Sequence, residues 1–349
     1  MDLVASVLDG NRLALARLLT QVENNTPGGR AALSGLFAYT GRAHLVGVTG
    51  APGTGKSSLV NQLAHYYRSL SEWRNSQQAP RIAIVAVDPS SPFTGGAILG
   101  DRVRMRDLAG DTGIFIRSMA SRGSLGGLAR STSGIVQALD AAGFDLILIE
   151  TVGAGQAEID IARLAHTTLV IEAPGLGDDI QAIKAGILEI ADVLVVNKAD
   201  RPGVESTERA LRGMLQLAHP VPRVFQNHHL METIFTLNKS VNAESESVSE
   251  QLLWIPPIQR TIATEGTGII GLADIIEKHY LYLLKSGEWL QRERYRLKAE
   301  LDLLLQETLV ARWRSSVSEE RYGQVLQSLV ERELSPWEAV TDLTAGGVT

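Results

Sequence analysis

A glycine-rich segment near residue 50 has the residue types and spacing to hold a phosphate. It matches the phosphate-binding loop pattern and consists of Gly50, Ala51, Pro52, Gly53, Thr54, Gly55, Lys56 and Ser57, with Ser58 directly after it. The glycines let successive backbone N–H groups turn toward a phosphate, and a following helix would aim its N-terminus at the anion. Lys56 would supply charge to the β and γ phosphates, and Ser57 a hydroxyl for Mg²⁺. A chance match is the bland alternative, but an apolar run before the loop and an amphipathic pattern after it favour nucleotide binding.

A second short motif indicates which base is bound. Asn197, Lys198, Ala199 and Asp200 directly follow the apolar run 193–196. A carboxylate at Asp200 can accept from both N1–H and the exocyclic amine of guanine, whereas adenine presents neither pair. The motif therefore predicts GTP rather than ATP, with the stem of Lys198 over the base and Asn197 tying this loop to the phosphate loop. Ile262, Ala263 and Thr264, at the end of the last predicted strand, are expected to offer backbone contacts to the guanine from the other side.

Three acidic residues lie between these motifs. Asp88 directly follows one apolar run, Glu150 directly follows another, and Asp101 follows a glycine-rich stretch. Mg²⁺ prefers oxygen ligands and keeps several waters, so one hydroxyl and a few carboxylates, bound directly or through water, would suit it. Each acid taken alone could equally be a helix cap or a surface ion pair. All three are expected at the ligand-binding edge of the predicted sheet, which favours the site.

Apolar runs alternating with helical patterns must position these motifs. The predicted strands are 44–49, 81–87, 144–149, 168–171, 192–196 and 257–263, and the predicted helices between them are 56–70, 127–141, 179–190 and 204–217. Continuous Val, Ile and Leu strands separated by helices are typical of a parallel sheet covered on both faces. We therefore predict an α/β fold with a mostly parallel sheet.

The predicted domains are a helical N-terminal extension (1–42), a nucleotide-binding domain (43–286) with a surface insertion at 218–253, and a helical C-terminal region (287–349). The turn residues 24–29 are expected to end the N-terminal helical unit. An apolar stripe in the C-terminal region has two interpretations, since it could pack on its own domain or serve as an oligomerisation arm; its members are Leu290, Leu297, Leu301, Leu304, Leu305 and Leu309. Ser335, followed by Pro336 and Glu338, predicts the start of a last helix.

Composition excludes several classes of protein. Among the 349 residues there is no cysteine, which excludes disulfide frameworks, thiolate zinc sites, iron–sulfur clusters and cysteine nucleophiles. The net charge of −6 disfavours broad electrostatic binding to nucleic acid or an anionic membrane. No apolar run approaches the roughly 18–20 residues of a membrane span. Without a basic region and an apolar stretch at the N-terminus, a cytoplasmic location is expected.

Two absences bear on the rate of hydrolysis. The residue after Gly153 is Ala154, so no glutamine lies where a Ras-like enzyme positions its attacking water, and Ala51 stands where partner-activated ATPases of this broad class carry an extra lysine. Slow intrinsic hydrolysis is therefore expected. Because 175 and 177 are glycines, residues 178–184 could form a hinged loop beside the nucleotide, and Lys184 is our candidate for a lysine that a partner brings to the phosphates.

The chain resembles the MeaB-like GTPases (MMAA in animals), which are chaperones of adenosylcobalamin-dependent acyl-CoA mutases. Beside the two nucleotide motifs, the segments that carry the resemblance are 41–44, 87–91, 100–102, 150–156 and 186–192. The resemblance implies a G-domain of the signal recognition particle and MinD class (SIMIBI), a C-terminal dimerisation arm, and a third switch segment at 177–184. It also implies Mg²⁺-binding and catalytic roles for Ser57, Asp88, Asp101 and Glu150.

The predicted function is that of a homodimeric GTPase that gates cofactor loading and protects a B12-dependent mutase, with GTP, GDP and Mg²⁺ as its ligands. Two alternatives remain. A nickel-delivery GTPase would usually carry cysteines or a histidine-rich tract to hold the ion. A transport-linked kinase, the label often given to such sequences, would need an acceptor site that no sequence feature identifies.

Overall fold

The computed structural model describes residues 2–89, 105–121, 127–151, 161–175, 190–217 and 253–345. The chain divides into two compact units, Met1–Arg296 and Leu297–Thr349, which we describe separately. The predicted helix 179–190, apart from its last residue, and the predicted insertion 218–253, apart from Leu253, lie outside the described residues.

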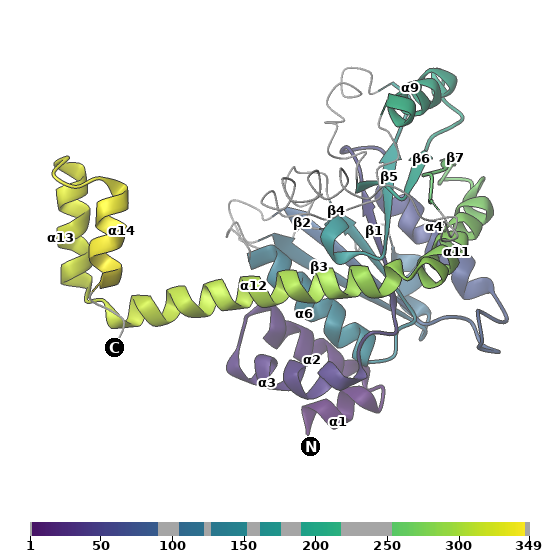
Figure 1. Ribbon diagram of the computed structural model, residues 1–349. Helices are drawn as coiled ribbons and strands as arrows, with labels where there is room; N and C mark the ends of the chain where they lie inside the picture. Colours follow the sequence, from purple (N-terminus) through teal and green to yellow (C-terminus); the bar gives the residue numbers. More distant parts are fainter. Residues whose placement is uncertain are drawn as a thin grey trace, which may run out of the picture. The chain divides into compact units, whose positions relative to one another are not determined.

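The first unit is built on a seven-stranded sheet of order β3-β2-β4-β1-β5-β6-β7 (Figure 1). Its strands are β1 (His44–Thr49), β2 (Ile82–Pro89), β3 (Ile114–Ser121), β4 (Leu146–Thr151), β5 (Thr167–Glu172), β6 (Val193–Val196) and β7 (Ile258–Arg260). Every pair of neighbours runs parallel. The predicted parallel α/β fold is therefore confirmed.

Two strands differ from the sequence prediction. No strand was expected at 114–121, but β3 forms there at an edge of the described sheet and pairs only with β2. Because an edge strand is covered less completely, it tolerates the polar residues Arg117 and Ser118, which break the apolar run. At the other edge, β7 ends at Arg260 rather than at residue 263, since the backbone of Ala263 donates to the Asn197 side chain instead of to a neighbouring strand.

Helices cover both faces of the sheet. On one face, α4 (Lys56–Ser69) and α11 (Ile269–Ser286) form a core with alternate residues of the strands, such as Val46 and Ile84. On the other face, α6 (Gly127–Ala141) packs on Leu45, Val85 and their neighbours, and α9 (Val204–Leu217) packs beside β6. Strands buried on both faces explain the unbroken apolar runs in the sequence.

The N-terminal region forms three helices that share the core of α6. They are α1 (Leu3–Leu8), α2 (Arg12–Glu23) and α3 (Pro27–Leu36), followed by the short 3₁₀ helix η1 (Phe37–Tyr39). The turn at 24–29 does not end the helical unit, because the Thr26 hydroxyl accepts from the Gly29 N–H at 3.1 Å and Pro27 begins α3. The turn residues of this segment are therefore partly an N-cap and a first helical turn.

Helix α12 (Glu288–Ser316) belongs to both units, since its residues up to Arg296 belong to the first. In the second unit, α13 (Glu319–Val330) and α14 (Pro336–Ala345) pack around Val325, Ala339 and Leu343. The predicted start of α14 is confirmed: the Ser335 hydroxyl accepts from the Glu338 N–H at 3.3 Å, and the Glu338 carboxylate accepts from the Ser335 N–H at 2.8 Å. These reciprocal bonds form a capping box.

Several leucines of the stripe are exposed among the described residues. Leu290 is 74% exposed, Leu301 64% and Leu309 54%.

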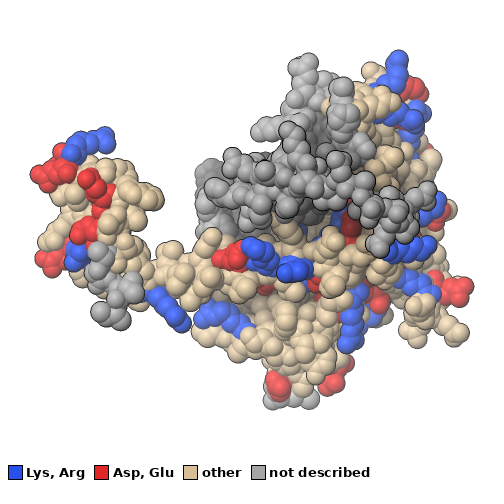
Figure 2. All heavy atoms as spheres, in the orientation of Figure 1, with Lys and Arg blue, Asp and Glu red and all other residues tan. Residues whose placement is uncertain are grey.

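Acidic and basic groups are interspersed on the face of the molecule that Figure 2 shows, without a continuous basic patch among its described atoms. Among the helices that the structure describes, none is both long enough and apolar enough to cross a bilayer.

Candidate nucleotide site

The glycine-rich loop joins β1 to α4 at the carboxyl edge of the sheet. Gly50 has φ +137°, and a Cβ there would lie 2.1 Å from the carbonyl oxygen of Ile171 on β5. Gly55 has φ +95°, and a Cβ there would lie 2.4 Å from Nδ2 of Asn197. Only glycine fits such contacts, so the loop lies directly against β5 and the base-recognition motif. Helix α4 begins immediately afterwards at Lys56, with its N-terminus at the loop.

Lys56 folds back over the loop. Its ammonium group donates to the carbonyl oxygens of Gly50 at 2.7 Å and Ala51 at 3.0 Å, and the residue is 6% exposed. A lysine in this place can act as a point charge for a phosphate held by the loop. The remaining loop residues Pro52, Gly53 and Thr54 precede it, and Ser58 is half-buried in the first turn of α4.

Ser57 and Glu150 meet beneath the loop. The Ser57 hydroxyl donates to Oε1 of Glu150 at 2.6 Å, and both residues are buried. Glu150 is the penultimate residue of β4, rather than the first residue after it, because the strand continues to Thr151. A hydroxyl and a carboxylate in contact form an oxygen donor set that fits the preference of Mg²⁺.

Asn197 links the two nucleotide motifs. Its Nδ2 donates to the carbonyl oxygen of Thr54 at 2.8 Å, and its Oδ1 accepts from the Thr261 hydroxyl and the Ala263 N–H, each at 3.1 Å. The side chain thereby joins the phosphate loop, the end of β6 and the turn after β7. The sequence analysis did not include Thr261 among the site residues. The only sequence feature that could have indicated its role is its position directly before Ile262.

Lys198 and Asp200 follow the end of β6. Lys198 has a left-handed backbone, φ 57°, and its ammonium group donates to the Gly53 carbonyl oxygen at 2.5 Å. Asp200 is exposed, so its carboxylate can receive a base from solvent. Ile262 and Thr264 lie in the turn after β7, half-buried and exposed respectively, beside buried Ala263. The structure thus gathers both motifs and this turn at one edge of the sheet.

The other site residues of the sequence prediction are only partly described. The backbone of Asp88 lies near the end of β2, which pairs with β4, but its side chain lies outside the described part of the structure. Asp101, Lys184 and the whole segment 177–184 also lie outside the described residues.

Comparisons with known proteins agree with this geometry. A family model described as "Methylmalonyl Co-A mutase-associated GTPase MeaB" matches residues 15–318. A protein of Pyrococcus abyssi, named provisionally as a GTPase, is 37% identical over all of this chain and 98% of its own length. The methylmalonic aciduria type A homologue of Mus musculus is 31% identical over 84% of this chain and 63% of its own length. GTPase ArgK of Escherichia coli is 40% identical over 55% of this chain and 56% of its own length.

A solved structure shows the same fold. The crystal structure of an LAO/AO transport system kinase superposes with a TM-score of 0.62 at 23% identity, covering 98% of this chain and 95% of that one. Together with the family model and the relatives, the phosphate loop and the guanine motif lead to one conclusion: the chain belongs to the MeaB family of GTPases and is a guanine-nucleotide-binding enzyme.

Proposed function

We propose that this GTPase is a chaperone of an adenosylcobalamin-dependent acyl-CoA mutase of the methylmalonyl-CoA type, whose cofactor loading it gates and which it protects or reactivates. The observation that carries the proposal is the match to the mutase-associated family over residues 15–318. The mouse relative, named for methylmalonic aciduria, supports the same class of partner.

The geometry supports a GTP-driven switch. With GTP bound, Lys56 would turn from the carbonyl oxygens of the loop to the β and γ phosphates, and Ser57 and Glu150 would hold Mg²⁺ directly or through water. The metal would neutralise charge on the phosphates. In hydrolysis a water oxygen attacks the γ-phosphorus while the bond to the β–γ bridging oxygen breaks, and catalysis comes from positioning and charge neutralisation. Asp88 and Asp101 are our further candidates for this site.

We also propose that the chain forms a homodimer through its C-terminal arm. The exposed leucines of α12 support this assembly, because an apolar stripe of this kind is unfavourable in water. Contacts of α12 with the first unit reach Arg296, so we place the boundary of the arm after that residue instead of after Ser286.

The decisive experiment measures GTP turnover by the purified full-length chain, alone and with an acyl-CoA mutase encoded in the same genome. We expect complex formation that depends on the bound nucleotide, together with faster turnover in the complex. As a control, the mutase is replaced by a bacterial protein that takes part in the maturation of a nickel enzyme, which tests the nickel-delivery alternative. If the mutase neither bound nor changed turnover in any nucleotide state, the chaperone proposal would be wrong while the GTPase assignment would stand.

A further inference from the structure

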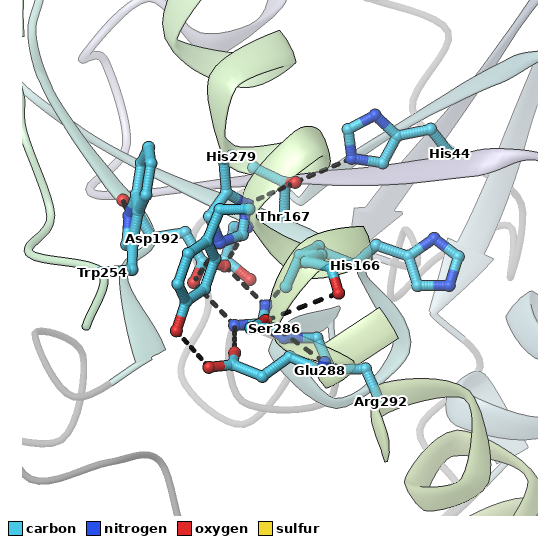
Figure 3. A network of polar contacts seen from close by, with 12 residues as sticks. His44, His166, Thr167, Asp192, Trp254, His279, Ser286, Glu288 and Arg292 are labelled. Carbon is cyan, nitrogen blue, oxygen red and sulfur yellow. Dashed lines mark hydrogen bonds and ion pairs between the residues drawn. The ribbon is translucent and has the colours of Figure 1, made fainter. Parts of the chain in front are cut away.

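Three buried histidines lie at the amino edge of the sheet, at the opposite end of the strands from the nucleotide loop. His44 begins β1, His166 directly precedes β5, and His279 belongs to α11; they are 0%, 2% and 0% exposed. Figure 3 shows them around Thr167, with Asp192 and Arg292 close by. None of these side chains takes part in the nucleotide site.

The hydrogen bonds fix where the proton of His44 lies. Arg74 approaches Nδ1 of His44 at 3.0 Å, and a guanidinium can only donate, so the proton of this ring is on Nε2. That Nε2–H donates to the Thr167 hydroxyl oxygen at 2.7 Å, so His44 is neutral. The same hydroxyl lies 2.9 Å from Nδ1 of His279, whose Nε2 lies 3.3 Å from Asp192.

His166 is neutral for the same kind of reason. The backbone N–H of Leu45 donates to its Nδ1 at 3.1 Å, so the proton is on Nε2 and is donated to Glu293 at 2.6 Å. The Trp289 ring lies 3.9 Å from the imidazole, centre to centre. Burial lowers the pKa of His166 below its ordinary value, against the opposing effect of the Glu293 carboxylate. Burial, and then the charge of Arg74, also lower the pKa of His44.

The same cluster holds the first turns of α12. Arg292 donates to the carbonyl oxygen of His166 at 2.6 Å and makes two bonds of 3.0 Å to the carboxylate of Asp192. Glu293 binds His166 and also Arg296, at 2.8 Å. Burial alone would raise the pKa of Glu293, but the bonds from His166 and Arg296 outweigh it and lower the pKa to about 2. The carboxylate therefore stays charged, and His44 and His166 are the groups left to titrate near neutral pH.

We propose that these residues form an acid-sensitive latch, in which proton uptake by His44 and His166 releases residues 288–296 from the sheet. A proton added to Nδ1 of His166 or His44 would set a donor against the Leu45 N–H or the Arg74 guanidinium. The carboxylates that would stabilise the added charge are already engaged, Asp192 by Arg292 and Glu293 by Arg296. Arg74 is paired with Glu277 at 3.0 Å, so it stays charged beside His44.

The direction of the pH effect follows from linkage. Release of residues 288–296 uncovers the two rings, so their pKa values rise toward the ordinary value of about 6.5, and the released state binds protons that the latched state excludes. The ratio of released to latched molecules should therefore rise as pH falls below about 6.5, by up to about tenfold per pH unit for each histidine. Above about pH 7.5 both rings are neutral in both states, and the ratio should not change.

Hydrogen exchange of the GDP-bound full-length chain between pH 5 and 8 tests the latch. After correction for the intrinsic exchange rate, amides 288–296 should lose protection below about pH 6.5, while α4 stays protected. His166→Asn keeps an acceptor for Leu45 but cannot titrate, so it should flatten the pH dependence by about one proton. The control His65→Gln removes a half-exposed histidine that pairs with Asp107 outside the cluster and should leave the profile unchanged. A flat wild-type profile, or a profile that His166→Asn does not alter, would overturn the proposal.

A second measurement needs no variant. In protein with ¹⁵N- and ¹³C-labelled histidine, NMR shifts of the rings distinguish the two neutral tautomers from the imidazolium. At pH 7.5 two of the seven histidines, His44 and His166, should be neutral with the proton on Nε2, and they should resist protonation below the pH at which the exposed rings titrate. Protonated rings, or protons on Nδ1, at these two positions would contradict the hydrogen-bond directions on which the latch depends.

Discussion

The basic side chains at the two edges of the sheet have different hydrogen-bond acceptors. At the carboxyl edge, Lys56 and Lys198 donate to neutral carbonyl oxygens of the phosphate loop. At the amino edge, Arg292 makes two bonds to a buried carboxylate, Asp192, and the rings of Trp289 and Trp254 lie tilted against His166 and His279. A bond between charged partners is stronger than a bond to a neutral acceptor. The carboxyl edge can therefore exchange its internal bonds for those of a phosphate, whereas the amino edge keeps its own.

The largest effect we expect concerns stimulation at the carboxyl edge. If the mutase orders the segment that carries Lys184, this lysine would act as an arginine finger does, for which rate effects of about 10³–10⁵ are known. Lys184→Ala should then bring the ratio of stimulated to basal GTP turnover close to one. Lys278→Ala, at an exposed position on α11, is the control and should retain full stimulation. Full stimulation of Lys184→Ala by the mutase would exclude the lysine from this role.

At the amino edge, Asp192→Ala should lower the free energy of unfolding by about 3–5 kcal/mol, because it leaves Arg292 buried with only the longer 3.4 Å ion pair to Glu288. Urea unfolding with saturating GDP measures this change. Asp274→Ala, at an exposed position on α11, removes the same charge from solvent and should cost less than about 0.5 kcal/mol. Equal losses for the two variants would mean that the buried pair contributes no more than a surface carboxylate.

Base choice tests the carboxyl edge without disturbing the fold. Asp200 should accept two hydrogen bonds from guanine, each worth about 1.5–3 kcal/mol because the acceptor is charged. Asp200→Asn should weaken GTP binding by roughly a hundredfold or more and shift preference to xanthine nucleotides, which carry a carbonyl where guanine has its amine. Calorimetric titration of both nucleotides measures the change. Wild-type protein that bound ATP as tightly as GTP would refute the guanine assignment.

Removing the arm after Arg296 should have the smallest effect on the stability and GDP binding of the nucleotide domain. A chain ending at Arg296 keeps Arg292 and Glu293 on the sheet, so it should bind GDP normally and scatter light as a monomer. A chain ending at Ser286 also lacks Arg292 and should lose about 3–5 kcal/mol of unfolding free energy. If the longer chain remained a dimer, the arm would not be the interface.

The parallel sheet could be predicted because its strands are buried on both faces and therefore read as continuous apolar runs. Strand β1 has the predicted bounds, and the predictions for β2, β4, β5 and β6 differ by at most two residues at each end. The edge strand β3 has a weaker apolar pattern, because its Arg117 interrupts the run and forms an ion pair with Glu23 of α2. That partner is distant in the sequence, so no local pattern reveals it. The helix at Pro27 was missed because its cap has the composition of a loop.

The sequence by itself determined the nucleotide motifs, since backbone turns at glycine and the residues beside them are local properties of the chain. Only the tertiary structure decided that Ser57 donates to Glu150 and that Asn197 joins three loops. It also brought His44, His166 and His279 together from three distant segments. Parallel strands need long crossovers, so residues at one edge of the sheet are far apart in sequence, and their contacts are fixed by strand order and register.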